Sequence, residues 1–438
     1  MADKVGLGTF ITDQSELTTS GLDIFTVPPV DSVLKEGRSV YYYPTTSVTN
    51  AGPYEFHITR DPDAFIHLPL TRLEGCLEVT RADGKAIEAA ETPSVVNLFP
   101  QSIFKQVECQ INGTEVCDLS TPTYAYKSFL ETHLTYSESA KKTHLQCSMY
   151  EKDEVKKEEV TDKTNEGSKN RAEKAIGKEF FFSNIIHSDF FQSEKYLIPN
   201  TDVHLKFIRN EDAFSILGPK ALKYMINVKN LKLLVRKVKI EPSVHNAIES
   251  QLANNPAIYN ITRSNIRTFQ VPSGTSSLDI PNVIQGNLPR SIHIGFVSTE
   301  AFNGAQDKNP FYFNHNGINN FNIKINGVPV CSTPLKPNFA TGEYVREYRW
   351  FLDNLGIHHE NESNGINMEE FKHNTCIWNF DLTPDLCNSF HLHETRTGSI
   401  DVTFTFGTSP TKALTMIVYA CYNSSIAIDV DRNVKVLS

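Results

Sequence analysis

The second half of this chain repeats the first, and this internal repeat limits the available folds more than any other feature. The segment VECQINGTEVC at residues 107–117 corresponds to FNIKINGVPVC at residues 321–331. Each has the pattern of a strand, a tight Asn-Gly turn and a return strand. The predicted hairpin turns are Asn112-Gly113 and Asn326-Gly327.

Two further pairs of segments follow in the same order along the chain. YKSFLE at 126–131 corresponds to YRWFLD at 348–353, and DVHLKF at 202–207 corresponds to DVTFTF at 401–406. Three ordered pairs predict a duplicated structural unit, because chance hairpins would not keep a common order.

The distance between the copies locates an insertion in the first one. It falls from 222 residues at the second pair to 199 residues at the third, and the intervening part of the first copy contains the charged segment 151–179. Apolar residues are nearly absent from this segment, which therefore predicts a solvated loop or a short exposed helix.

Outside this segment the hydrophobic pattern is that of one-sided β-strands. Apolar residues alternate with polar or small residues at Ile292, Ile294 and Phe296, and again at Val402 and Phe404. Such alternation is typical of antiparallel sheets with one buried face. The alternation that includes Leu231, Leu233 and Val235 changes phase before Val238 and Ile240, which predicts a β-bulge.

Few helices are expected. Residues 124–136 and 344–355 are candidates at equivalent places in the two copies, and residues 244–254 form a third that follows Pro242. The predicted fold is all-β, with two tandem eight-stranded antiparallel jelly rolls (a double jelly roll) and a few short helices in loops.

This pattern divides the chain into four parts. We expect an extended N-terminal arm at 1–52, a first jelly roll at 53–240 with the charged loop 151–179, a connecting helix or linker at 241–258, and a second jelly roll with a C-terminal tail at 259–438.

Composition excludes several classes of protein. The net charge of −9 and the lack of a Lys/Arg-rich arm are unlike a strongly basic nucleic-acid binder. No signal-peptide pattern opens the sequence, and no apolar run has the length of a membrane span, so a soluble, non-secreted product is expected. The eight cysteines form no C-x-x-C pair, so no zinc knuckle is predicted.

The search for chemical motifs predicts no catalytic residue and no cofactor. Phosphate-binding, dinucleotide-binding and nucleophile-elbow motifs are missing from the sequence. The one lead to a metal is His391 with His393, because two histidines two residues apart on a strand point to one face, as in cupins. An exposed hairpin end explains the same residues more simply.

Several long segments then resemble the major capsid protein of Polinton/Maverick elements and their adintovirus relatives. The resemblance extends from LDIFTVPP near residue 22 to the last strand. The segments that carry it are NLFPQSIFKQVECQINGTEV, SFLETHLTYSESAKKTHL, GNLPRSIHIGFVSTEAFNGAQDKNPFYFNH, NFDLTPDLC and IAIDVDRNV.

The resemblance implies a structural role. In this family, double jelly-roll subunits form homotrimers, which are pseudo-hexameric capsomers that tile an icosahedral shell around a double-stranded DNA genome. The implied partners are the chain itself, neighbouring capsomers, and penton and minor capsid proteins, with no sequence-specific nucleic acid. The implied location is the virion, after synthesis in the host cytoplasm and assembly in the nucleus.

Further expectations concern the arm and the status of the gene. The arm and the tail after Ile428 are expected near the shell floor, so that deletion of residues 1–40 impairs shell assembly but leaves the trimer folded. The gene belongs to a virus, an integrated element or a co-opting host. The alternatives to a capsid protein are a tandem jelly-roll carbohydrate-binding protein and a cupin-like metal protein.

Overall fold

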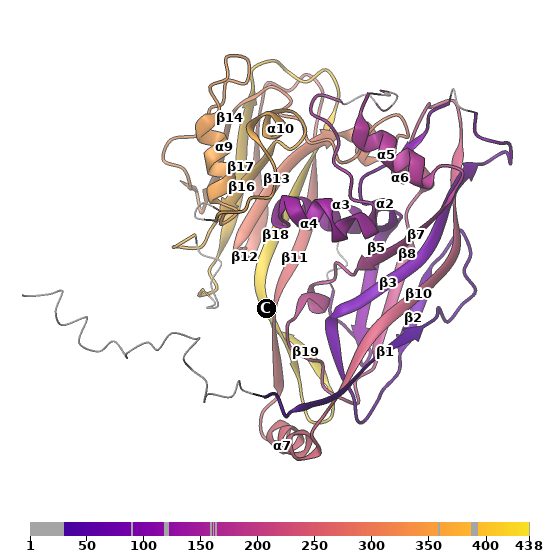
Figure 1. Cartoon of the computed structure of the whole chain (residues 1–438). Coiled ribbons are helices and arrows are strands. Elements are labelled where there is room, and N and C mark those ends of the chain that lie inside the picture. The colour runs from indigo at the N-terminus through magenta and orange to yellow at the C-terminus, as the bar shows by residue number, and fades with distance from the viewer. Residues whose placement is uncertain are drawn as a thin grey trace, which may run out of the picture.

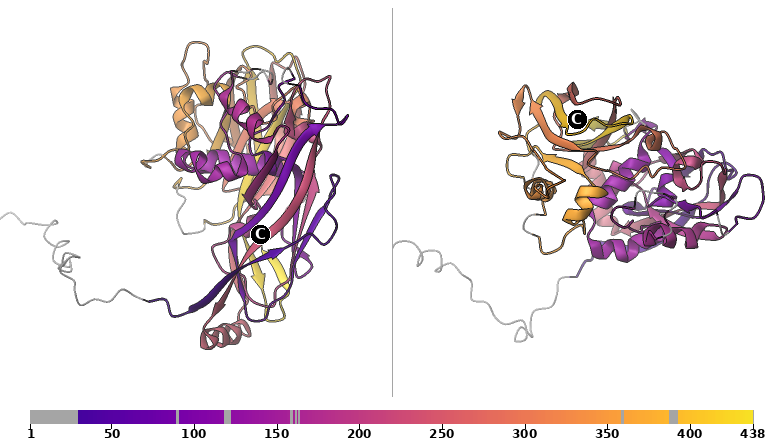
Figure 2. Two further views of the ribbon diagram at one scale, coloured as in Figure 1. Left: turned by 45° about the vertical axis from the view of Figure 1, so that its right-hand side comes forward. Right: turned by 90° about the horizontal axis from the view of Figure 1, so that it is seen from above.

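The structure is a computed structural model in which two β-sandwiches lie side by side (Figure 1). It describes residues 30–88, 91–117, 122–157, 160, 162, 164–357, 360–386 and 393–437. The first half of the chain forms one sandwich and the second half forms the other, and the view from above in Figure 2 shows the two next to each other.

The first sandwich contains two four-stranded antiparallel sheets. Their strand orders are β1-β10-β3-β7 and β2-β8-β5-β6, and β4 pairs with β9 in a small separate sheet. The bounds are β1 (Leu34–Tyr42), β2 (Tyr54–Ile58), β3 (Phe65–Arg81), β4 (Ser94–Val95), β5 (Phe104–Ile111), β6 (Thr114–Glu115), β7 (Glu179–Ile185), β8 (Val203–Arg209), β9 (Ile216–Leu217) and β10 (Tyr224–Ile240).

The second sandwich repeats this topology. Its sheets have the orders β11-β18-β13-β16, with β19 added on β18, and β12-β17-β14-β15. The bounds are β11 (Ala257–Val271), β12 (Ser277–Asn287), β13 (Ser291–Ser298), β14 (Ile318–Ile325), β15 (Val328–Pro329), β16 (Ile377–Asp381), β17 (Thr397–Phe406), β18 (Leu414–Ile428) and β19 (Val434–Leu437).

Both sandwiches are therefore jelly rolls. If β4, β9 and β19 are set aside, each unit pairs its first, eighth, third and sixth strands in one sheet and its second, seventh, fourth and fifth in the other. The predicted fold class, two eight-stranded antiparallel jelly rolls, is confirmed.

The extended arm predicted for residues 1–52 is corrected for Leu34–Tyr42. These residues form β1, which pairs antiparallel with β10 from Leu34 opposite Ile240 to Tyr42 opposite Leu233. The first jelly roll reaches eight strands only with this one. Its side chains are mostly exposed, so the sequence lacks the alternation that marks a half-buried strand.

The duplicated hairpin turns have the same backbone geometry. The φ angles are 47° and 81° at Asn112 and Gly113, and 50° and 81° at Asn326 and Gly327. Two consecutive residues with positive φ match the right-handed twist of a two-residue hairpin, and Asn-Gly tolerates this conformation best. Each Asn side chain also accepts a hydrogen bond from a backbone N–H at the start of a neighbouring strand, that of Asp202 (2.8 Å) or Ser399 (2.9 Å).

Short helices fill the connections between strands. They are α2 (Phe99–Ser102), α3 (Tyr124–Thr135), α4 (Glu138–Lys142), η2 (His144–Ser148), α5 (Glu166–Ala175), η3 (Asp189–Gln192), α6 (Asp212–Ser215), α7 (Pro242–Leu252), α8 (Thr299–Phe302), α9 (Val345–Asp353) and α10 (Met368–His373). Pro242 starts α7, where its fixed φ suits the first helical turn, and α7 joins β10 to β11. None of the helices in the described part of the chain could cross a membrane.

The charged segment 151–179 is less solvated than predicted. Its helix α5 buries Arg171 completely. The Arg171 guanidinium donates to the backbone carbonyls of Val95 and Glu151 and to the carboxylate of Asp153. A buried charge is tolerated because these acceptors satisfy it, and such partners do not show in local composition.

The phase change predicted in β10 corresponds to an irregular register. In its pairing with β3, the register shifts between Leu234 and Arg236, and again between Val228 and Asn230. The first shift lies beside the predicted bulge.

Truncation tests the boundary between arm and strand. Removal of residues 1–29 should leave the melting temperature nearly unchanged, because every described strand remains. Removal of residues 1–42 should lower it by roughly 5 °C or more, since the edge of β10 loses its partner. Differential scanning fluorimetry of both truncations measures the difference, and equal melting temperatures would show that β1 contributes nothing to the sheet.

Candidate functional site

The most elaborate arrangement of side chains lies where the two jelly rolls meet. Helix α3 belongs to the first unit, between β6 and β7, but its buried face packs into the apolar core of the second (Figure 1). The Phe129 ring stacks on Phe311 with centroids 4.4 Å apart, and Tyr126 stacks on Phe302 at 5.6 Å. One core therefore includes residues from both halves of the chain.

The exchange is reciprocal. Tyr259 and Ile261 of β11 and Ile426 and Ile428 of β18 are buried in the core of the first jelly roll. The Tyr259 hydroxyl accepts a hydrogen bond from the Ile198 N–H at 3.1 Å and donates to the Tyr196 carbonyl at 3.2 Å. Separation of the units would expose apolar surface on both, at about 25 cal/mol per Å².

A buried group of charges crosses the same junction. Lys127 and Glu131 lie one turn apart on α3, and Asp189 begins η3. The Lys127 ammonium donates to the Asp189 carboxylate and lies 3.8 Å from that of Glu131. All three groups come from the first jelly roll.

Both carboxylates of this group then bind the second jelly roll. Asp189 accepts hydrogen bonds from the hydroxyl (2.8 Å) and the backbone N–H (3.1 Å) of Ser264 on β11. Glu131 accepts one from the Tyr419 hydroxyl on β18 at 3.1 Å. His187 and Gln192 of the first unit also contact Glu131, at 2.6 and 2.9 Å.

The pKa shifts of Lys127 and Glu131 favour the charged forms of both side chains. Burial alone would raise the pKa of Glu131, but the charge of Lys127 and the hydrogen bond from His187 outweigh it and lower the pKa. Burial would lower the pKa of Lys127, but the negative charges of Asp189 and Glu131 raise it. These groups are held ionised, so they are suited to fixing an orientation and not to exchanging protons near neutral pH.

A second connection joins α3 to the other end of the junction. The His133 ring contacts the Tyr150 hydroxyl at 2.7 Å and the Thr375 hydroxyl, in the second unit, at 2.9 Å. Burial, aided by the charge of Lys141, lowers the pKa of His133 far below its ordinary value. His133 therefore remains neutral and acts as a hydrogen-bonding bridge.

Segments from both units also contact each other near His133. The Lys141 ammonium donates to the carbonyls of His133 (2.6 Å) and Asn364 (2.7 Å), and burial lowers its pKa to about 7. Lys152, in the charged segment, forms an ion pair with Glu370 of α10. The charged segment is thus attached to the second jelly roll as well as to the first.

Of the two histidines singled out as a possible metal site, only His393 lies within the described residues, so the pair stays a prediction. His393 is described, and its Nε2 lies 3.1 Å from the Asp385 carboxylate. Within the described ranges, no group of three His, Cys, Asp or Glu side chains has an arrangement that could hold a metal.

The sequence did contain a signal for the charged junction. Lys127 and Glu131 in YKSFLE correspond to Arg349 and Asp353 in YRWFLD. The side chains of the second pair, which lie 2.8 Å apart, are 58% and 34% exposed, whereas those of Lys127 and Glu131 are only 15% and 11% exposed. The repeated i,i+4 pair was visible in the sequence, but its burial in one copy depends on the neighbouring jelly roll.

Comparisons of the sequence with known proteins give a relative but no family. No family model matches the chain. The chain is 24% identical over 396 residues to an uncharacterized protein of Caenorhabditis elegans. The aligned region covers 87% of this chain and 92% of that relative.

Solved structures decide the fold. A chain in the cryo-EM structure of the Sputnik virophage superposes with a TM-score of 0.67 at 11% identity, covering 97% of this chain and 93% of that one. The PBCV-1 virus capsid matches with a TM-score of 0.58 at 12% identity, covering 94% and 98%. The mavirus major capsid protein matches with a TM-score of 0.52 at 11% identity, covering 97% and 95%.

This is the double jelly roll of viral major capsid proteins. In a double jelly roll, two sandwiches act as one body only if their relative orientation is fixed. Here α3, the reciprocal apolar exchange and the charged group at Lys127, Glu131 and Asp189 fix it.

Lys127→Met tests the charged group. The substitution leaves two buried carboxylates without their cation, which typically costs about 3–5 kcal/mol. Lys412→Met is the control, because Lys412 and Glu300 form an ion pair that is more than half exposed, and loss of such a pair costs about 1 kcal/mol or less. Urea unfolding should therefore show a much lower midpoint for Lys127→Met alone, and similar midpoints for the two variants would contradict a structural role for the cluster.

Proposed function

We propose that this protein is a viral major capsid protein, whose homotrimers are pseudo-hexameric capsomers that tile an icosahedral shell around a double-stranded DNA genome. The observation that carries the proposal is the presence of two jelly rolls with identical strand order, locked side by side in one chain. The similarity to chains of the Sputnik virophage and the PBCV-1 capsid along almost their whole length supports it.

Duplication has a direct use in such a shell. A closed threefold ring of single jelly rolls has three lobes, whereas a ring of double jelly rolls has six and an almost hexagonal outline. Hexagonal units can tile a surface. Around such a ring of six positions, first and second jelly rolls alternate. This requires both units to have the same topology, as they do here, and a fixed mutual angle, which the contacts at the junction support.

The finer assignment is to the Polinton/Maverick and adintovirus-like group. It depends on the segments quoted above, among them AFNGAQDKNPF and FDLTPDLC. A relative of similar length in Caenorhabditis elegans supports it, because a gene carried by an element integrated in an animal genome would have such relatives.

The proposal also names partners and a location. The partners are further copies of this chain, neighbouring capsomers, and penton and minor capsid proteins, and the location is the virion after assembly in the nucleus. We place residues 1–29, which precede β1 in the sequence, in contact with neighbours at the shell floor.

The solution mass tests the proposal. Light scattering of the purified protein should give about 148 kDa, three times the 49.3 kDa of the chain. A stable 49 kDa monomer at high concentration would contradict the capsomer and would favour a binding protein built on the same fold.

A further inference from the structure

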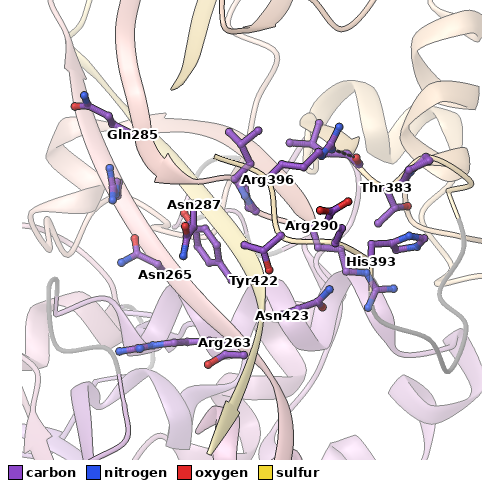
Figure 3. A pocket seen from close by; sticks show the side chains of 18 residues that line it. Arg263, Asn265, Gln285, Asn287, Arg290, Thr383, His393, Arg396, Tyr422 and Asn423 are labelled. Atoms are coloured by element: carbon purple, nitrogen blue, oxygen red, sulfur yellow. Dashed lines mark hydrogen bonds between the residues drawn. The ribbon is translucent and has the colours of Figure 1, made fainter. Parts of the chain in front are cut away.

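A cavity of about 620 Å³ opens at one end of the second jelly roll, between its two sheets (Figure 3). Strands β11 and β18 contribute side chains from one sheet, and the end of β12 contributes side chains from the other. Residues 288–290, 382–384 and 393–396 complete the wall.

The wall of this cavity is strongly basic. Four arginines line it, together with His393, and Glu394 is the one acidic residue among the described residues of the wall. Asparagine, glutamine, serine and threonine side chains occupy much of the remainder. The arginines are Arg263, Arg267, Arg290 and Arg396.

Three of these guanidinium groups have no carboxylate partner within the part of the chain that the structure describes. Arg267 donates to the Val283 carbonyl at 2.9 Å, and Arg396 donates to the Leu382 carbonyl at 2.5 Å. Arg263 has no hydrogen bond or ion pair there. Most of their donor groups are therefore available to a ligand, since a guanidinium carries five N–H donors.

Concentrated positive charge has a cost unless an anion compensates it. Charges within one cavity of this size are separated by distances comparable to the Debye length of about 8–10 Å, so salt screens their repulsion only in part. The net charge of the chain is −9, which makes this local excess of cations unusual for the molecule. A bound polyanion would relieve the repulsion.

We propose that this cavity binds a polyanion with several phosphate groups, held by Arg263, Arg267, Arg290 and Arg396. The planar guanidinium fork pairs with phosphate oxygens in a bidentate manner, which explains the use of arginine in place of lysine. The volume is sufficient for several linked phosphates. The phosphates come either from a free polyphosphate or from the backbone of a nucleic acid, and the site does not depend on the oligomeric state proposed above.

The experiment is isothermal titration calorimetry of the full chain with two probes, tripolyphosphate and a short single-stranded DNA oligonucleotide. The test variant is Arg263→Gln, which removes no hydrogen bond between described residues, and its control is Arg60→Gln. The stronger version is Arg263→Gln with Arg396→Gln, and its control is Arg60→Gln with Arg72→Gln. Arg60 and Arg72 are exposed arginines of the first jelly roll, so each control carries the same change of charge as its test variant.

We expect tripolyphosphate to bind. Arg263→Gln should lower the affinity for tripolyphosphate about tenfold, which corresponds to the loss of a charged hydrogen bond. The control should remain within about twofold, because simple loss of net charge acts weakly at a distance. Binding of tripolyphosphate alone identifies a free polyphosphate as the source, and equal sensitivity of DNA binding to Arg263→Gln identifies a nucleic acid.

Three results would overturn the proposal. The first is that neither probe binds, and the second is that the test and control variants have equal affinities. The third concerns an additional probe, a peptide copying residues 1–29, which is an acidic segment with four carboxylates and one lysine. If only this peptide bound, the cavity would be a protein-docking site.

Discussion

The pairing of Lys127 with Asp189 and Glu131 is the interaction on which the rest of the structure depends most. It places ionised groups in a buried junction, where a charge without a partner is costly. The two carboxylates also accept hydrogen bonds from Ser264 and Tyr419 of the second jelly roll, which lie opposite α3 and η3. Apolar packing around α3 and the hydrogen bonds of the charged group therefore join the two units at the same junction.

Gene duplication explains the topology but not the differences between the copies. The i,i+4 charge pair is buried at Lys127 and Glu131 and exposed at Arg349 and Asp353. The two jelly rolls therefore share a strand order while their helices differ in role: α3 packs at the junction, whereas α9 leaves its Arg349–Asp353 pair partly exposed.

Much of the fold was predictable from local patterns. The repeat and the alternation gave the class, the Asn-Gly dipeptides marked both hairpin turns, and apolar spacing located α3, α7 and α9 within a few residues. These features depend on residues near one another in the sequence. Strand β1 was missed because an edge strand with exposed side chains has no alternation, and the burial of Arg171 was missed because its partner Val95 is distant in the sequence. The junction was missed for the same reason: Glu131 and Tyr419 are 288 residues apart.

We propose that the junction makes the two jelly rolls of each chain one rigid body, which supplies two of the six lobes of a trimer. Single-particle cryo-EM of the purified oligomer tests this most directly. We expect class averages with threefold symmetry and six lobes, in which the angle between the two jelly rolls of each chain is the same in every subunit. Particles with two lobes, or trimers in which that angle varies between subunits, would contradict it.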